Sequence, residues 1–268
     1  MIVIRSCEGF EELEACVRLQ VETWGYNEGD VIPRRAFVVA QKIGGQVIGA
    51  FDTEVSASAP NGGPESLVGF TLALPGVKAG DGEPRAYLHS HMLAVKETYR
   101  NRGLGMKLKL EQRREALARR ITLIEWTFDP LEIKNAYLNI HKLGAITRDY
   151  RANFYGVSSS QLQGGLPTDR LVAEWRLDSP RVKAILDGCP EVTQPFEERI
   201  ELRIQVPASI YQWKASIIGR ERALAIQMEN RRKFQKAFSQ GLAVLAFSRD
   251  AEGNGVFELG LPTPAEVD

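Results

Sequence analysis

Residues 93–110 read LAVKETYRNRGLGMKLKL, a short apolar run followed by a polar turn with two glycines and then a segment of helical period. The first N–H groups of a helix have no carbonyl partner within it, and the aligned peptide dipoles leave about half a positive charge at that end. Gly103 and Gly105 lack the Cβ atom that would hold a ligand away from the backbone. This order of strand, glycine turn and helix predicts a binding site for a phosphate group.

The composition excludes several classes of protein. With 268 residues, 44% apolar and 25% charged, the chain has the make-up of an ordinary folded protein. Its 34 basic and 34 acidic residues cancel, which argues against nucleic-acid binding through a broad positive surface. Cys7, Cys16 and Cys189 have no metal-ligand spacing, which predicts reduced thiols and no structural zinc. Without a leader pattern or a long apolar run, we expect a cytoplasmic protein with no membrane segment.

The apolar patterns on both sides of the glycine turn alternate between strands and helices. Before the turn they predict strands at 2–6, 47–55, 67–74 and 87–95, and helices at 9–24 and 33–43. After the turn they predict a helix at 104–120, a strand at 121–128, a helix at 135–143, and strands at 145–155 and 170–177. Turn-forming residues predict a loose hairpin tip at 56–64 and a second loop at 76–84.

Two of these elements have predicted faces that concern the glycine turn. Alternation along the strand at 87–95 places His89, His91, Leu93 and Val95 on one face. The helix at 104–120 has an apolar stripe about 60° wide at about 100° per residue, formed by Met106, Leu110, Leu117 and Ile121.

The C-terminal third predicts a separate, smaller unit. Asp178, Ser179 and Pro180 form a predicted joint, so we divide the chain into domains at 1–178 and 179–268. The second domain has a strand at 199–206, a helix at 216–239, and a hairpin formed by 242–247 and 256–261. A β-α-β-β extension of this size buries little surface alone. It is therefore expected to dock on the first domain, on a partner subunit as a homodimer, or on both.

The Arg-x-x-Gly-x-Gly spacing at 100–105 resembles the acyl-coenzyme A loop of the GNAT N-acyltransferases. The order of elements over 1–178 resembles the same family, and so does the Lys-Leu-Gly ending at 142–144, although Ala145 replaces the aromatic residue that usually follows. The resemblance implies an α/β fold with a GNAT-like mixed central sheet flanked by helices. It also implies that acyl-coenzyme A binds as co-substrate, without a metal.

The resemblance also implies which residues bind coenzyme A. The end of the strand would lie beside the pantetheine arm, the turn would bind the pyrophosphate, and two asparagines on one face of the next helix would reach the pantetheine amides. These positions are Leu93, Val95, Arg100, Arg102, Gly103, Leu104, Gly105, Asn135 and Asn139.

Three residues are predicted to be catalytic. His89 lies six residues before Val95, where relatives that modify lysine have a carboxylate that acts as general base, and His91 is the second choice. Many relatives have a tyrosine four residues before Gly144 that protonates the leaving thiolate, but Ile140 stands there. Tyr137, three residues earlier and on nearly the same helix face, is the expected replacement.

Together these features predict an N-acyltransferase that moves an acyl group from acyl-coenzyme A to a primary amine. Acetyl is the default for the family, and succinyl with an amino-acid acceptor is a second option. The missing tyrosine favours an alternative from another class, a catalytically silent module that binds or senses acyl-coenzyme A. A dinucleotide-binding fold is disfavoured, because its fingerprint needs a third glycine where this chain has Leu108.

Overall fold

The fold is described from a computed structural model, which covers residues 1–55, 62–79, 83–160, 163–188 and 199–267. The chain divides into two compact units. Unit 1 comprises Met1–Ile124 and Ser159–Gln161, and unit 2 comprises Glu125–Ser158 and Leu162–Asp268. The predicted division at residue 178 stays a prediction. The hairpin tip at 56–61, the loop residues 80–82 and Cys189 lie outside the described residues.

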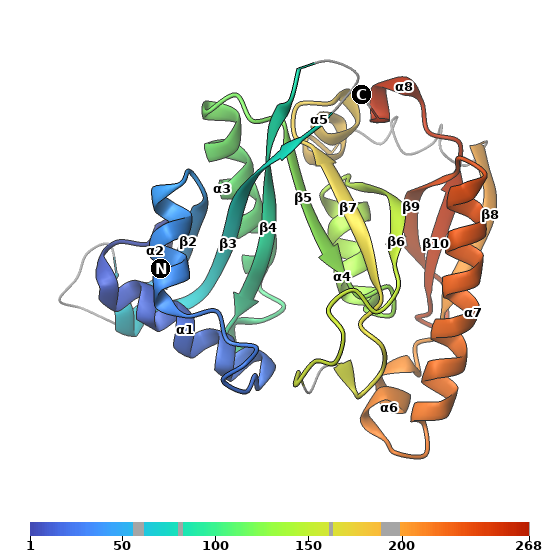
Figure 1. Cartoon of the computed structure of the whole chain (residues 1–268), viewed down its shortest axis with the longest axis horizontal. Helices are drawn as coiled ribbons and strands as arrows, with labels where there is room; N and C mark the ends of the chain where they lie inside the picture. The colour runs from blue at the N-terminus through green and yellow to red at the C-terminus, as the bar shows by residue number, and fades with distance from the viewer. Residues whose placement is uncertain (56–61, 80–82, 161–162, 189–198, 268) are drawn as a thin grey trace. The chain divides into compact units, whose positions relative to one another are not determined.

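Unit 1 is built on four consecutive antiparallel strands in the order β1, β2, β3 and β4 (Figure 1). The strands are β1 (Ile2–Ser6), β2 (Gln46–Asp52), β3 (Leu67–Lys78) and β4 (Arg85–Val95). Its helices are α1 (Gly9–Trp24), α2 (Arg34–Lys42) and α3 (Leu104–Ala118), with short 3₁₀ turns η1 (Pro64–Ser66) and η2 (Glu97–Tyr99). The hairpin of β3 and β4 is longer than predicted, because β3 extends into the expected loop at 76–84 and β4 begins two residues before the predicted strand.

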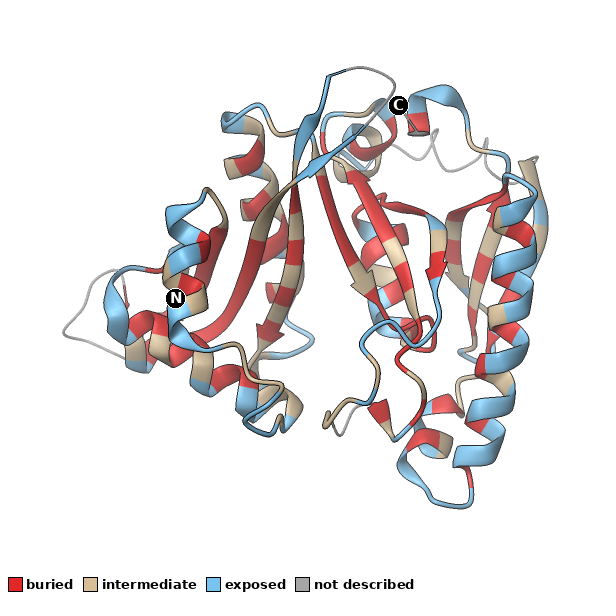
Figure 2. Ribbon diagram, in the orientation of Figure 1, coloured by how far each residue is buried: buried red, intermediate tan, exposed pale blue. Residues whose placement is uncertain are grey.

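The two faces of the unit 1 sheet have separate hydrophobic cores. One cluster joins α1 and α2 to residues such as Phe70, Leu72, Met92 and Ala94. The other joins α3 to β2 and β3, and Leu93 and Val95 pack against it. Neighbouring residues of β4 therefore contribute to opposite cores, as the alternation of buried and intermediate residues along the strand indicates (Figure 2).

A β-bulge in β4 corrects the predicted face. Leu72 lies opposite Met92 but Ala73 lies opposite Ser90, so His91 is an extra residue in the ladder. Beyond the bulge the alternation is inverted, since Ser90 bonds to α3 although Leu93 also faces α3. The prediction that His89 shares a face with Leu93 and Val95 was wrong. His89 lies opposite Leu74, on the side of the α1 and α2 core.

The buried face of α3 also differs from the prediction. Its buried residues are Leu104, Leu108, Lys109, Gln112 and Ala116, whereas Met106, Leu110 and Leu117 are only partly covered and Ile121 follows the helix. The two faces are roughly opposite, because residues 106 and 108 differ by about 200° around a helix. Polar side chains occupy part of the buried face, so a count of apolar residues alone selected the wrong side.

Unit 2 has six strands in the order β5, β7, β6, β9, β10 and β8. They are β5 (Leu123–Phe128), β6 (Ile146–Arg151), β7 (Arg170–Arg176), β8 (Ile200–Val206), β9 (Ala243–Arg249) and β10 (Gly255–Gly260). The helices are α4 (Ile133–Ala136), the π-helix η3 (Tyr137–Lys142), α5 (Pro180–Leu186), α6 (Ile210–Ala215), α7 (Arg220–Ser239) and α8 (Pro264–Val267). The predicted joint is the start of α5, where Ser179 accepts a hydrogen bond from the Val182 amide as an N-cap.

The C-terminal extension continues the sheet of unit 2. β9 pairs with β6 at Thr147 and Val244, and β10 and β8 follow in antiparallel order. The long helix α7 lies along these strands (Figure 1). Its Phe234 stacks on Tyr150 of β6 and meets Phe257 of β10 edge-on, with ring centroids 5.7 and 5.2 Å apart. The extension therefore docks on strands from the N-terminal two thirds, which is one of the arrangements predicted; docking on a partner subunit stays a prediction.

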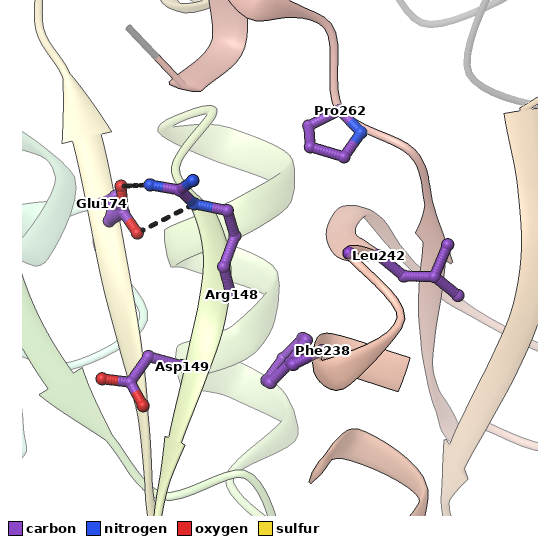
Figure 3. Close-up of a pocket in the computed structure, with 7 residues that line it drawn as sticks. Arg148, Asp149, Glu174, Phe238, Leu242 and Pro262 are labelled. Atoms are coloured by element: carbon purple, nitrogen blue, oxygen red, sulfur yellow. Dashed lines mark hydrogen bonds and ion pairs between the residues drawn. The ribbon is translucent and has the colours of Figure 1, made fainter. Parts of the chain in front are cut away.

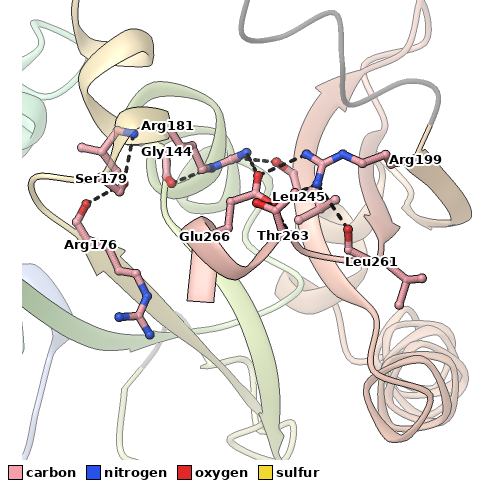
Figure 4. A network of polar contacts seen from close by, with 10 residues as sticks. Gly144, Arg176, Ser179, Arg181, Arg199, Leu245, Leu261, Thr263 and Glu266 are labelled. Atoms are coloured by element: carbon pink, nitrogen blue, oxygen red, sulfur yellow. Dashed lines mark hydrogen bonds and ion pairs between the residues drawn. The ribbon is translucent and has the colours of Figure 1, made fainter. Parts of the chain in front are cut away.

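An ion pair between Asp169 and Arg231 reinforces this docking. The fully buried Asp169 accepts two hydrogen bonds from Arg231 of α7, at 2.8 and 2.7 Å, and others from the Tyr150 hydroxyl and the Asn153 amide. At the C-terminus, Glu266 accepts hydrogen bonds from Arg199 and from the buried Arg181 (Figure 4).

Arg181 connects that carboxylate to one strand and a helix end. Its guanidinium also donates to the Gly144 and Leu245 carbonyls. A buried guanidinium needs several acceptors to offset its lost hydration, and the acceptors named here come from three separate segments of unit 2. The C-terminal helix α8 is thereby fastened to α5 and β9.

Candidate functional site

The glycine turn of unit 1 has the predicted geometry. β4 ends at Val95, η2 follows, and the chain turns through Asn101 and Gly103, both with positive φ, into α3. Gly103 is the N-cap at φ 76°, where glycine is favoured, and a Cβ atom built on it would meet nothing within 4 Å. No side chain caps the helix. The start of α3 therefore has no side-chain cap and lies beside a left-handed glycine with open space around its Cβ position.

Charge at the turn favours an anion. Arg100, Arg102 and Lys107 are exposed around the start of α3, and its first turn has no acidic residue. Cations at the positive end of a helix dipole destabilise the helix by about 0.3–1 kcal/mol each, which a bound anion offsets. Arg100 Nε donates to the Val95 carbonyl and the Arg102 guanidinium lies 5.2 Å from the Tyr99 ring. Among the described residues, neither arginine forms an ion pair.

The Tyr99 hydroxyl fastens the turn to the sheet. It donates to Asp52 Oδ2 at 2.8 Å, and the Lys96 amide donates to the Val68 carbonyl. The hydrogen bond from Tyr99 lowers the pKa of Asp52, so the carboxylate stays charged as an acceptor. The first part of the turn is thus held by β2 and β3, while the Cβ position of Gly103 at its other end is open.

The predicted base and its neighbour lie further along β4. His89 and His91 are half-buried, with ring centroids 6.1 Å apart. Burial, then the neighbouring His91 and the Lys109 amine, lower the pKa of His89 from 6.5 to about 4. Burial also lowers the pKa of His91. Both imidazoles are therefore neutral at neutral pH and each has a nitrogen that accepts a proton.

The remaining predicted residues belong to unit 2. Tyr137 starts the π-helix η3, in which the Leu143 amide donates to the Leu138 carbonyl five residues earlier. A π-helix has more residues per turn than an α-helix, so the prediction that Tyr137 and Ile140 share nearly one face was wrong. Ile140 is buried at 1% exposure, whereas Tyr137 is half-buried and stacks on the exposed His141 at 4.4 Å.

Two cations also lie near the Tyr137 ring. The Arg249 guanidinium of β9 is 5.1 Å from the ring centroid and the Lys142 amine is 5.6 Å from it. The extension therefore contributes Arg249 to the surroundings of a predicted catalytic residue. Asn135 is exposed and Asn139 is 4% exposed, so the two asparagines do not form the shared polar face that was predicted.

Unit 2 also contains a cavity of about 380 Å³ that the sequence did not indicate (Figure 3). Arg148, Asp149 and Glu174 line one part of it, and Phe238, Gly241, Leu242 and Pro262 line the rest. Arg148 forms a bidentate ion pair with Glu174, in which two guanidinium nitrogens lie 3.2 and 2.8 Å from the two carboxylate oxygens. Asp149 forms an ion pair with Arg151. Its charges are thus neutralised within the protein.

Neither a metal-binding cluster nor a membrane-spanning helix is found among the described residues. No cluster of three or more histidine, cysteine or acidic side chains there is arranged to hold a metal ion. In the same part of the chain, no helix has the length and apolar character needed to span a bilayer. Cys7 and Cys16 are buried free thiols with sulfur atoms 3.8 Å apart.

No family model and no curated protein sequence matches the chain. Solved structures do. Arabidopsis thaliana NAA60 in complex with acetyl-CoA aligns with a TM-score of 0.51 at 17% identity, over 65% of this chain and 98% of that chain. The same protein with a bisubstrate analogue aligns with a TM-score of 0.50 at 16% identity, over 65% of this chain and 98% of that chain. The Escherichia coli ribosomal-protein-S18-alanine N-acetyltransferase aligns with a TM-score of 0.48 at 15% identity, over 66% of this chain and 94% of that chain.

Proposed function

The chain has the fold of the GNAT N-acetyltransferases, and on that premise we propose that it is an N-acyltransferase that uses acyl-coenzyme A. The observation that carries the proposal is the start of α3. Its amides have no side-chain cap, Gly103 leaves open space at that point, and the exposed Arg100, Arg102 and Lys107 lie within four residues of Leu104 in the chain, with no acidic residue in the first turn. This combination suits the pyrophosphate of coenzyme A. The structural neighbour that binds acetyl-CoA supports it.

In the proposed reaction the amine nitrogen attacks the thioester carbonyl, the carbon–sulfur bond breaks, and the thiol leaves as thiolate. His89 accepts the proton that the amine loses, directly or through water. Because its pKa is about 4, the base form is present throughout the neutral range. Leu93 and Val95 would lie beside the pantetheine arm, at the end of the strand that precedes the turn.

We propose acetyl as the acyl group and a small amine, including an amino acid, as the acceptor, with succinyl as the second option. The leaving thiolate needs little help, so the buried Ile140 does not exclude turnover. Tyr137 remains the proposed acid, and Asn135 and Asn139 remain proposed pantetheine contacts. The homodimer through 179–268 also stays a proposal.

A catalytically silent acyl-coenzyme A sensor is the second candidate. The aliphatic side chain of Ile140, at the position of the missing tyrosine, favours this candidate. The low pKa of His89 favours it as well, because His89 is then a weak base. The two candidates share the binding turn and differ only in turnover.

Calorimetric titration with coenzyme A tests the shared part. Gly103→Val adds a branched side chain at φ 76° in the space assigned to the phosphates, so binding should be lost. Gly188→Val is the matched control, because Gly188 has φ 71° and equally open surroundings but lies after α5. If both variants bind coenzyme A as the parent does, the binding site is not at this turn.

A further inference from the structure

Lys214 is a buried cation of the C-terminal extension that bonds to the turn after β5. It lies on α6, and its side chain is 6% exposed. Its Nζ donates to Asp129 Oδ2 at 2.9 Å and to Glu132 Oε1 at 2.8 Å. A buried ion pair contributes little net stability because desolvation offsets the attraction, and its best-attested role is to select one geometry.

The ammonium group of Lys214 is charged at neutral pH. Burial alone would lower its pKa, but the charges of Asp129 and Glu132 and the hydrogen bonds to them outweigh burial and raise the pKa. The two carboxylate side chains are 9% and 25% exposed. Without the lysine, two acidic groups would lie close together in a largely buried setting, so the turn after β5 depends on this one cation for its conformation.

The turn that Lys214 holds leads directly to Tyr137. Asp129 Oδ1 accepts a second hydrogen bond, from the Leu131 amide at 2.8 Å, and Glu132 is the N-cap of α4. The Tyr137 amide donates to carbonyls of α4. Because α4 has only four residues, it is too short to keep a helical conformation without tertiary contacts. The place of Tyr137 therefore depends on what holds α4.

Two further residues of the extension contact the same segment. The hydroxyl of Tyr211, three residues before Lys214 on α6, accepts a hydrogen bond from the Lys134 amide of α4 at 3.3 Å. The Arg249 guanidinium of β9 lies 5.1 Å from the Tyr137 ring centroid. The extension thus contacts the N-cap of α4, a backbone amide of α4 and the ring that follows it.

The helix α6 is itself fixed within unit 2. Ile210 at its start is fully buried, and the Ala208 amide just before it donates to Asn254 Oδ1, between β9 and β10, at 2.8 Å. A Cβ atom built on Gly164 would lie 2.7 Å from the Lys214 carbonyl oxygen, so the backbone of that loop packs directly on α6. Lys214 therefore reaches the turn from an anchored element.

We propose that Lys214 is a positioning residue for Tyr137, which holds the turn after β5 and thereby fixes the place of the phenol in η3. The inference rests on the proposed function, because it gives the extension a role in presenting the proposed acid. Lys214 would act through Asp129 and Glu132, without touching the substrate. The π-helical conformation of η3 agrees with this role, since such turns are frequent at functional sites.

The stack of Tyr137 on His141 provides a readout that needs no enzymatic activity. The two ring centroids are 4.4 Å apart and the planes are inclined by 18°, so the ring current of the phenol shifts the NMR signals of His141. The chain has three histidines, and Tyr137→Leu identifies the His141 signals and gives their unstacked position. In Lys214→Met these signals should move toward that position, while those of His89 and His91 in unit 1 stay unchanged.

Arg231→Met is the matched control. It removes the cation of another buried ion pair of unit 2, in which Asp169 also bonds to Tyr150 of β6 and to Asn153. The His141 signals should stay in place in this variant. Equal movement in both variants would mean a general loosening of unit 2 and would refute the proposal. Signals that keep the parent position in Lys214→Met would refute it as well.

A second variant carries the test if Lys214→Met does not fold. Glu132→Leu removes one of the two carboxylate partners, and Lys214 keeps its ion pair with Asp129. The Glu132 side chain makes no capping hydrogen bond, so α4 loses no cap. The His141 signals should again move toward the unstacked position, and parent-like signals in this variant would overturn the proposal.

Kinetic measurements separate the inference from the proposed function. A parent protein that releases no thiol with any amine refutes the acyl transfer, whereas the His141 signals still decide whether Lys214 positions Tyr137. In an active parent, Lys214→Met should lower kcat by about 10²-fold, as expected for a small misplacement of a reacting group. Coenzyme A affinity should change less, because the glycine turn belongs to unit 1. A kcat equal to that of the parent would refute the role in catalysis.

Discussion

Replacing Arg231 by methionine should destabilise the protein strongly, because the change removes the charged partner of a fully buried carboxylate. Asp169 has no exposed surface and the Arg231 side chain is 19% exposed, with nitrogen–oxygen distances of 2.7 and 2.8 Å. Removing one partner of a buried ion pair lowers the free energy of unfolding by about 3–5 kcal/mol, because the other charge stays buried without compensation. The Tyr150 hydroxyl and the Asn153 amide still donate to Asp169, so we expect the lower end, about 3 kcal/mol.

The thermal midpoint measured by circular dichroism should fall by about 6–12 °C, at about 2–4 °C per kcal/mol for a chain of this size. Lys233→Met is the matched control, since it removes an exposed pair with Glu229 on the same helix, with side chains 44% and 50% exposed. It should leave the midpoint essentially unchanged. Adding Asp169→Leu to Arg231→Met should recover part of the loss, because no buried charge remains. Equal midpoints for Arg231→Met and Lys233→Met would refute the reasoning.

Two further outcomes are expected. His89→Ala should lower turnover by about 10²- to 10⁴-fold with little change in acyl-coenzyme A affinity. The acidic limb of the parent's pH–rate profile should lie near pH 4. If the variant keeps both the rate and the acidic limb of the parent, another group takes the proton. Burial alone would raise the pKa of Glu266, but hydrogen bonds from Arg199 and Thr263 and the charge of Arg181 outweigh it and lower the pKa below 4.5. The stability that Glu266 contributes is therefore fully present above pH 4.5 and lost as the pH falls through its lowered pKa. The rate of hydrogen exchange at α8 should increase in that pH range for the parent. In Glu266→Gln the exchange at α8 should already be faster at neutral pH, and it should show no further increase as the pH falls.

The order of elements was predictable because periodicity reports local structure directly. Each strand and most helices of the described chain follow the predicted ranges within a few residues, and the left-handed Gly103 appears where the turn requires it. The extra short helices α5, α6 and α8 were missed, since segments of four to seven residues contain too few turns to show a helical period.

The errors at the site have physical causes that periodicity does not contain. A single extra residue at His91 inverts the alternation, and the sequence around it looks like an unbroken strand. A π-helix shifts the face of Tyr137 in the same way. Lys109 went unnoticed because its environment is set by Ser90, nineteen residues away, and no local pattern reveals that contact.

Long-range polar contacts were likewise outside the reach of sequence patterns. Asp169 and Arg231 are 62 residues apart, and Arg181 and Glu266 are 85 apart. Each residue alone resembles an ordinary surface charge. Only the fold brings the partners together and buries them. The sequence therefore predicted that the extension must dock, but not which residues attach it to the rest of unit 2.

The central claim is acyl transfer, and a thiol-release assay tests it most directly. Purified protein would be mixed with acetyl- or succinyl-coenzyme A and a panel of amines and amino acids, with Gly103→Val as the binding-deficient control. The account predicts release of free thiol that requires both an amine and the intact glycine turn. A parent protein that binds coenzyme A in calorimetry yet releases no thiol above the Gly103→Val background with any amine would contradict it.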